Sequence, residues 1–214
     1  MANLSVSELF SSIQGESHWA GYPCTFVRLA GCNLDCAYCD TRYARQGGAA
    51  YSISALLEAV RARGLHTVEL TGGEPLFQRE SLELLEELCR AGYRVLLETN
   101  GSLPLDGVPE SVHVVMDLKS PGSGMVERMH WPNLALLKPS DEVKFVLTDR
   151  ADYEWAVATA ARNGLLGRVR ISFSPCAGRL APADLAAWLL EDRLDVRLQL
   201  QLHRILWPQR DRGV

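Results

Sequence analysis

Three of the six cysteines fall within one short run, Gly31-Cys32-Asn33-Leu34-Asp35-Cys36-Ala37-Tyr38-Cys39. A loop of this length can turn three thiolates toward one point, and soft sulfur ligands suit a soft metal centre. A structural zinc site would need a fourth Cys or His, and the nearest histidine, His18, precedes the loop. A 4Fe-4S cluster on three cysteines leaves one iron open to an outside ligand. The run therefore predicts a metal centre, and an open iron–sulfur cluster is the favoured kind.

The remaining cysteines are scattered. Cys89 lies on the apolar face of a predicted helix, and Cys24 and Cys176 flank predicted strands, where cysteine packs as a small hydrophobic side chain. The first five residues contain no basic region followed by an apolar stretch, so a secretory leader is not expected. We therefore expect a cytoplasmic protein in which the thiols are free or bind metal.

Length and charge narrow the class of protein further. The chain has 214 residues, 47% of them hydrophobic, which suits one domain over residues 1–214. Its uncharged apolar runs are shorter than the roughly 20 residues of a membrane helix. A formal net charge of -4 opposes a broad electrostatic contact with nucleic acid. We expect a soluble protein with neither a membrane nor a nucleic-acid partner.

Strand-like runs alternate with turns and helical patterns along the chain. Seven runs predict strands: 24–29, 66–70, 93–98, 112–117, 143–148, 169–174 and 196–202. Four segments predict helices: 52–63, 81–91, 153–163 and 183–191. This alternation favours a mostly parallel sheet, but a complete eightfold barrel would need more helices. We predict an α/β fold, an incomplete, open (β/α) barrel with about six to seven mostly parallel strands and fewer helices.

Special residues follow several of the predicted strands. They are the cysteine loop and residues 71–75, 99–101, 117–119 and 174–175. Carboxyl ends of parallel strands share one edge, so we expect one common site there. Thr71-Gly72-Gly73-Glu74-Pro75 suits a tight turn, and it also suits a ligand loop in which glycines admit the ligand and Glu74 binds an amino group. The nearby cysteine loop favours the ligand loop.

A second polar group lies before and within the first predicted strand. Gln14, Glu16 and Arg28 supply an amide, a carboxylate and a guanidinium. Taken singly, Gln14 and Glu16 are typical of an ordinary loop, and Arg28 is typical of a solvated charge on a strand. Together they suit a planar heterocycle with amide and amine edges and a carboxylate.

The motifs resemble a known superfamily and, within it, one family. The spacing C-x3-C-x2-C, with Tyr38 before the last cysteine, resembles the radical S-adenosylmethionine (radical SAM) signature. Residues 12–16, 26–33, 38–41, 71–75 and 201–203 together resemble the 7-carboxy-7-deazaguanine synthase family over almost the whole chain. The one departure is Ser17-His18-Trp19, where many members have a further glycine. The resemblance implies an open barrel of the radical SAM type.

The resemblance also implies site residues. Cys32, Cys36 and Cys39 would ligate the 4Fe-4S cluster. S-adenosylmethionine would be held by Tyr38, Asp40, Gly73, Glu74, Asp117 and Lys119. The substrate would be held by Ile13, Gln14, Gly15, Glu16, Arg28 and Thr71. Thr41 would ligate Mg²⁺, and Glu16 and His203, the latter placed on the last predicted strand, are candidates for proton transfer.

The family reaction converts 6-carboxy-5,6,7,8-tetrahydropterin to 7-carboxy-7-deazaguanine, on the route to queuosine. A 5'-deoxyadenosyl radical abstracts a hydrogen atom, the ring contracts and ammonia leaves. The resemblance further implies a one-electron donor such as flavodoxin and a homodimer. A glycyl-radical activating enzyme would share the cysteine loop and residues 72–74 but would not explain Gln14, Glu16 and Arg28. A zinc or electron-transfer protein would use the cysteines without cleaving a cofactor.

Overall fold

The structure is a computed structural model that describes residues 3–214, and a nine-stranded sheet forms its centre. The strands are β1 (Asn3–Ile13), β2 (Pro23–Leu29), β3 (Ala49–Ser52), β4 (Thr67–Gly72), β5 (Arg94–Thr99), β6 (His113–Asp117), β7 (Glu142–Leu147), β8 (Arg170–Pro175) and β9 (Arg197–Leu198). Their order is β3-β1-β2-β4-β5-β6-β7-β8-β9. Strands from β2 onward along this order run parallel, whereas β1 pairs antiparallel with both β2 and β3. Because β3 and β9 form two separate edges, the sheet does not close into a barrel.

The parallel part of the sheet confirms the predicted open α/β fold, and each of the predicted strand runs has its counterpart there. Strands β1 and β3 were not predicted. A register shift between Val6 and Glu8 interrupts the alternation of β1, so its pattern is not that of a regular strand. The last predicted strand, 196–202, is wrong at its end, because only Arg197 and Leu198 pair with β8 and the chain then leaves the sheet.

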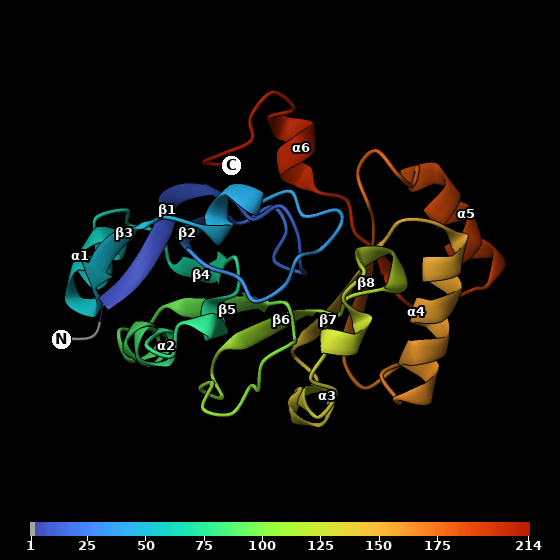
Figure 1. Cartoon of the computed structure of the whole chain (residues 1–214), viewed down its shortest axis with the longest axis horizontal. Helices are drawn as coiled ribbons and strands as arrows, with labels where there is room; N and C mark the ends of the chain where they lie inside the picture. Colours follow the sequence, from blue (N-terminus) through green and yellow to red (C-terminus); the bar gives the residue numbers. More distant parts are fainter. Residues whose placement is uncertain (1–2) are drawn as a thin grey trace.

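The four predicted helices are confirmed with small shifts at their ends, as α1 (Ile53–Arg61), α2 (Ser81–Arg90), α4 (Arg150–Arg162) and α5 (Pro182–Glu191). Two short helices, α3 (Asn133–Leu136) and α6 (Leu202–Leu206), were not predicted. Figure 1 shows α2, α3 and α4 on the side of the sheet away from α6 and the C-terminus. Over residues 3–214, none of the helices combines the length and the apolar character needed to cross a membrane.

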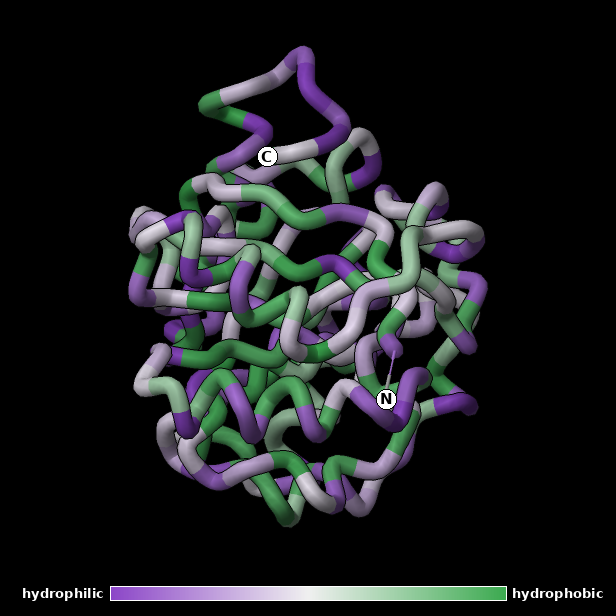
Figure 2. The backbone as a smooth tube through the Cα atoms, turned by 90° about the vertical axis from the view of Figure 1, so that its left-hand side faces the viewer, coloured by the Kyte–Doolittle hydropathy of each residue, from purple (hydrophilic) through white to green (hydrophobic). Residues whose placement is uncertain are grey.

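Alternation along the central strands separates an apolar face from a polar one. Val68 and Leu70 of β4 and Phe145 of β7 belong to the buried core on the helix side. The residues next to these in each strand, such as Glu69 on β4 and Lys144 on β7, point to the opposite face of the sheet, because side chains alternate across a strand. Figure 2 shows the hydrophobic segments in the body of the molecule and a largely hydrophilic loop near the C-terminus. The sheet thus presents charged side chains toward α6.

Glu142, at the start of β7, anchors the loop that joins β1 to β2. Its side chain is 1% exposed, and its Oε2 accepts hydrogen bonds from the backbone N–H of His18, at 2.9 Å, and from His18 Nδ1, at 3.3 Å. Its Oε1 accepts from the Ser172 hydroxyl at 2.6 Å and from Arg197 Nη2 at 3.2 Å. The same loop carries Gln14, so Glu142 fixes a segment that is predicted to bind the substrate.

Replacing Glu142 with Gln tests this anchor. Burial by itself raises the pKa of Glu142, but hydrogen bonds from His18 and Ser172 and the charge of Arg197 outweigh it and lower the pKa below its ordinary value. Such a group stabilises the fold above its unfolded pKa, and this contribution is lost as pH falls through the folded pKa. We expect Glu142→Gln to lower the free energy of unfolding by about 1–3 kcal/mol at pH 7.

The variant should also lose less stability than the unchanged protein when the pH falls below about 4.5. Urea unfolding between pH 3 and pH 7 measures both effects. Glu86→Gln, at an exposed position on α2, is the control and should change little. A Glu142→Gln variant with the stability and acid dependence of the unchanged protein would contradict the anchoring role.

Candidate active site

One cavity of about 440 Å³ lies on the polar face of the sheet, within the size range of small-molecule sites. Its walls come from the β1–β2 loop, the cysteine loop, the ends of β4 to β8 and the C-terminal segment. Every site residue predicted from the sequence lines this cavity, with Glu74 as the sole exception. The structure therefore brings the two predicted groups, the cysteines and the Gln14–Arg28 set, into one site cavity.

The three clustered cysteines lie on the loop that follows β2. Cys36 is buried, and Cys32 and Cys39 are half-buried. Burial raises the pKa of Cys36 to about 11 and also raises that of Cys32, so these thiols are neutral at pH 7 without a metal. Metal binding would replace these protons. Three thiols that line one cavity fit a cluster with an open iron, because the cavity gives that iron access to a second ligand.

Gly73 joins the turn after β4 to the cysteine loop. Its backbone N–H donates to the Leu29 carbonyl at 3.0 Å, and the Glu74 N–H donates to the Gly31 carbonyl at 2.8 Å. A Cβ atom on Gly73 would stand 2.1 Å from the Gly31 carbonyl oxygen and 2.8 Å from Cys32 Cβ. This position requires glycine because the two loops approach so closely, and the approach places the Gly73 backbone beside a predicted cluster ligand.

Gly73→Ala should therefore displace the cysteine loop. We expect a loss of about 1–3 kcal/mol from overpacking and a several-fold lower iron content after reconstitution. Gly64→Ala is a matched control: Gly64 has a φ of +68° with no atom near the added Cβ, so its cost is about 1–2 kcal/mol of backbone strain. Iron analysis and thermal unfolding of both variants provide the test. Full iron binding by Gly73→Ala would contradict the tight contact.

Glu74 lies behind the cavity wall and is fully buried. Its Oε1 accepts hydrogen bonds from the Thr99 hydroxyl at 2.8 Å and the Leu76 N–H at 3.0 Å, and its Oε2 accepts from the Asn100 N–H at 2.7 Å. Burial raises its pKa to about 7. The carboxylate thus ties the turn after β4 to the end of β5. Its assigned contact with the amino group of S-adenosylmethionine stays a prediction.

Asp117 and Lys119 form the wall beyond the cysteines. Lys119 Nζ donates to Asp117 Oδ2 at 2.7 Å and lies 5.9 Å from the centre of the Tyr38 ring. Asp117 Oδ1 is buried and has no hydrogen-bond partner among the residues that the structure describes. A buried carboxylate oxygen normally has a donor, so this atom fits a ligand with an amino or hydroxyl group, such as S-adenosylmethionine.

The residues assigned to the substrate are held in place by their neighbours. Gln14 Oε1 accepts a hydrogen bond from the Glu16 N–H at 2.7 Å, and Gln14 Nε2 donates to Glu69 Oε2. Arg28 Nε pairs with Glu8 Oε2 at 3.1 Å, and this oxygen also accepts from the Tyr43 hydroxyl at 2.7 Å. These contacts fix an amide and a guanidinium before any ligand binds.

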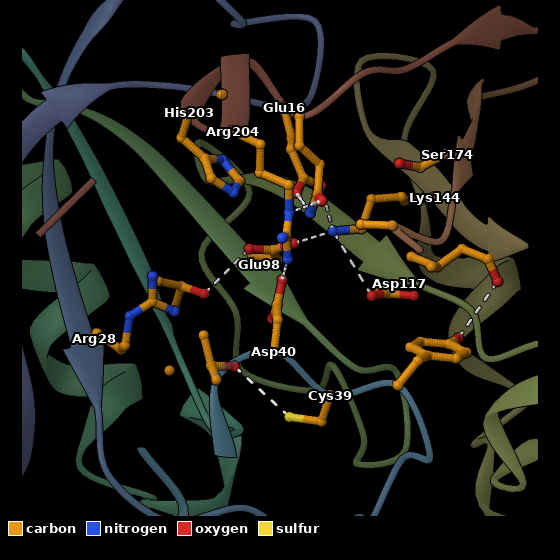
Figure 3. A pocket seen from close by; sticks show the side chains of 18 of the residues that line it. Glu16, Arg28, Cys39, Asp40, Glu98, Asp117, Lys144, Ser174, His203 and Arg204 are labelled. Carbon is orange, nitrogen blue, oxygen red and sulfur yellow. Dashed lines mark hydrogen bonds and ion pairs between the residues drawn. The ribbon is translucent and has the colours of Figure 1, made fainter. Parts of the chain in front are cut away.

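Three charged strand residues in the cavity were missed by the sequence analysis: Glu69, Glu98 and Lys144. Figure 3 shows Glu98 and Lys144 turned toward each other near the centre of the site, with Glu16 close by. Each missed residue interrupts an apolar strand pattern, as in Val143-Lys144-Phe145. A charged residue inside an otherwise apolar strand run is the signal that would have identified them.

His203 lies on α6 and not on the last strand, which corrects the sequence expectation. The chain leaves the sheet after β9, and the Leu202 N–H donates to the Gly15 carbonyl at 3.0 Å. A Cβ atom on Gly15 would stand 2.7 Å from His203 Nδ1, so glycine there admits the imidazole ring. Burial lowers the pKa of His203 below its ordinary value. The histidine lines the cavity, and its role in proton transfer stays a prediction.

Comparison with known proteins first identifies the class of protein to which the chain belongs. The sequence pattern of the Radical SAM superfamily matches residues 27–174. The fold is similar to that of the crystal structure of QueE from Escherichia coli, with a TM-score of 0.72 at 22% identity over 94% of this chain and 95% of that one. With the three-cysteine loop at the edge of an open parallel sheet, these matches define a radical SAM protein.

Full-length similarity then gives the family. The chain is 49% identical to the 7-carboxy-7-deazaguanine synthase of Chlorobaculum tepidum, over 100% of this chain and 98% of the relative. It is 44% identical to the 7-carboxy-7-deazaguanine synthase of Koribacter versatilis, over 99% of this chain and 100% of the relative. The chain belongs to the 7-carboxy-7-deazaguanine synthase family. The resemblance drawn from its motifs is confirmed, and a glycyl-radical activating enzyme is not supported.

Proposed function

We propose that this protein converts 6-carboxy-5,6,7,8-tetrahydropterin to 7-carboxy-7-deazaguanine with loss of ammonia, in queuosine or related 7-deazapurine biosynthesis. The observation that carries the proposal is one shared cavity, which the cysteine loop lines together with Gln14, Glu16 and Arg28. Relatives with this name match the chain over its full length. A cavity that holds both a cofactor and a heterocyclic acid suits this reaction.

On one side of the cavity, the chain would hold a 4Fe-4S cluster and S-adenosylmethionine. When bound, this pair supplies a 5'-deoxyadenosyl radical that removes a hydrogen atom from C6 of the substrate. Cys32, Cys36 and Cys39 would ligate three irons of the cluster. Asp117 Oδ1, buried without a partner among residues 3–214, would accept a hydrogen bond from the cofactor, with Lys119 fixing its orientation.

On the other side, the chain would orient the pterin. Arg28 would pair with the substrate carboxylate, because a guanidinium matches a carboxylate with two parallel hydrogen bonds. Gln14 and Glu16 would face the amide and amine edges of the ring. Burial of these groups excludes water, which strengthens each contact. Glu16 and His203 are the candidates for moving protons when ammonia leaves.

We extend the proposal to a metal ion and to partners. The Thr41 hydroxyl, 3.8 Å from Cys39 Sγ, lines the cavity and is the kind of hard oxygen ligand that Mg²⁺ takes, with water and a carboxylate completing its shell. Mg²⁺ would hold the substrate carboxylate in place. The resemblance adds a one-electron donor such as flavodoxin, a homodimer, a single radical SAM domain and a cytoplasmic location.

Anaerobic incubation of the reconstituted protein tests the proposal. The mixture contains S-adenosylmethionine, a reductant, Mg²⁺ and 6-carboxytetrahydropterin, and mass spectrometry detects the product. We expect 7-carboxy-7-deazaguanine and free ammonia, with slower formation when Mg²⁺ is omitted. Cleavage of S-adenosylmethionine without change of the pterin would point to another radical SAM reaction. An iron-free chain with tightly bound zinc would refute the enzyme proposal.

A further inference from the structure

Lys144 of β7 is the point at which carboxylates from three segments meet. Its side chain is 5% exposed, and Nζ lies 2.7 Å from Glu16 Oε2 and in contact with Glu98 Oε1. Nζ also lies 3.7 Å from Asp117 Oδ2, and Asp117 is the register partner of Lys144 across β6 and β7. Figure 3 shows these side chains converging in the middle of the cavity. One buried ammonium thus connects the substrate side of the site with the cofactor side.

The second oxygen of each glutamate has only a neutral partner. Glu98 Oε2 accepts from the Thr71 hydroxyl at 3.2 Å, and Glu16 Oε1 accepts from the Gln201 amide at 2.8 Å. Among residues 3–214, Lys144 is the one cationic side chain that forms an ion pair with either carboxylate. The other titratable or charged groups around the pair lie on neighbouring elements: Arg28, Glu69, Asp117, Lys119, His203 and Arg204.

A comparison of the half-buried Glu98 with the buried Glu69 shows what the ammonium does. Burial by itself raises the pKa of Glu98, but contact with Lys144 outweighs burial and lowers the pKa below its ordinary value. Glu69 faces the same cavity without an ammonium in contact, and burial together with the charge of Glu98 raises its pKa. Contact with Lys144 thus lowers the pKa of one glutamate, whereas burial raises the pKa of its neighbour.

The charge state matters because the pterin presents N–H donors. An ionised carboxylate accepts hydrogen bonds through both oxygens, whereas a protonated one carries a donor of its own toward those N–H groups. We propose that Lys144 is a positioning residue that holds the carboxylates of Glu16 and Glu98 as hydrogen-bond acceptors aimed at the N–H edge of the pterin. This inference rests on the proposed function and specifies how its substrate side is maintained.

Substrate affinity as a function of pH tests the proposal. For Lys144→Gln we expect the KM for carboxypterin to be about 10- to 100-fold higher at pH 7 and to fall again toward pH 9, because loss of the ammonium raises the pKa of Glu98, whose carboxyl then ionises as pH rises. The unchanged protein should show no such recovery. His203 does not titrate in this window, because burial lowers its pKa.

Two further variants complete the design. Lys144→Arg keeps the charge and should show a KM that does not vary with pH, even if Lys144→Gln folds poorly. Lys138→Gln removes an ion pair with Asp141 outside the cavity and should leave the KM unchanged. The same KM increase at every pH in Lys144→Gln, or a pH-dependent KM in Lys144→Arg, would overturn the role of Lys144 while leaving the proposed function intact. Failure of the unchanged protein to convert carboxypterin would overturn both.

Discussion

A Cys36→Ala variant is expected to bind no stable four-iron cluster and to lose reductive cleavage of S-adenosylmethionine down to background. Cys36 is the middle cysteine of the three-cysteine loop, and its buried side chain lines the site cavity. With two thiolates left, the loop would no longer supply the three protein ligands proposed for the cluster. Iron analysis after anaerobic reconstitution and detection of 5'-deoxyadenosine measure the two losses.

Cys89→Ala is the matched control for this prediction. Cys89 lies on α2, is half-buried against the hydrophobic core and does not line the cavity. This variant should keep its iron and its cleavage activity, with at most a modest loss of stability. A Cys36→Ala variant with full iron content and activity would remove Cys36 from the ligand set. Equal iron loss in both variants would indicate a general effect on folding.

Arg28→Ala is expected to raise the KM for carboxypterin by about 10- to 100-fold, since hydrogen bonds to charged groups contribute about 1.5–3 kcal/mol. The ion pair with Glu8 aligns the Arg28 guanidinium. The substitution should therefore remove a contact with the substrate carboxylate and leave the cluster in place. Uncoupled cleavage of S-adenosylmethionine should therefore persist. Steady-state kinetics with separate detection of product and 5'-deoxyadenosine distinguish the two reactions.

Arg28→Lys refines the same test. Lysine keeps the positive charge but lacks the planar fork that matches a carboxylate, so its KM should fall between those of the unchanged protein and Arg28→Ala. A carboxypterin KM that is unchanged in Arg28→Ala would contradict the assignment. A parallel loss of S-adenosylmethionine cleavage would place Arg28 on the cofactor side instead.

The parallel strands were predictable because each is a short, mostly apolar and β-branched run bounded by turn residues. Strand β1 escaped prediction because a register shift between Val6 and Glu8 breaks its alternation. The run 196–202 alternates like a strand, yet pairing stops at Leu198 because the chain turns to contact Gly15. That contact joins residues far apart in the sequence, which no local pattern contains.

The parts of the site built from rare sequence motifs were predictable, whereas the parts built from common charged residues were not. The three-cysteine spacing and the Gly72-Gly73 pair are rare enough to mark a ligand loop, and both line the cavity. Glu98 and Lys144 resemble the polar positions of a half-exposed strand, and only the packing of neighbouring strands buries Lys144 and brings Glu98 into contact with it. Glu74 was assigned to the cofactor from its motif, but its carboxylate is occupied by hydrogen bonds within the protein.

Transfer of a hydrogen isotope tests the central claim most directly, namely that the cofactor and the pterin occupy one cavity and react with each other. The substrate carries deuterium at C6, and mass spectrometry follows the label during anaerobic turnover. We expect deuterium to appear in recovered S-adenosylmethionine or 5'-deoxyadenosine as 7-carboxy-7-deazaguanine forms. Formation of the product with no label in either adenosyl compound would contradict this account.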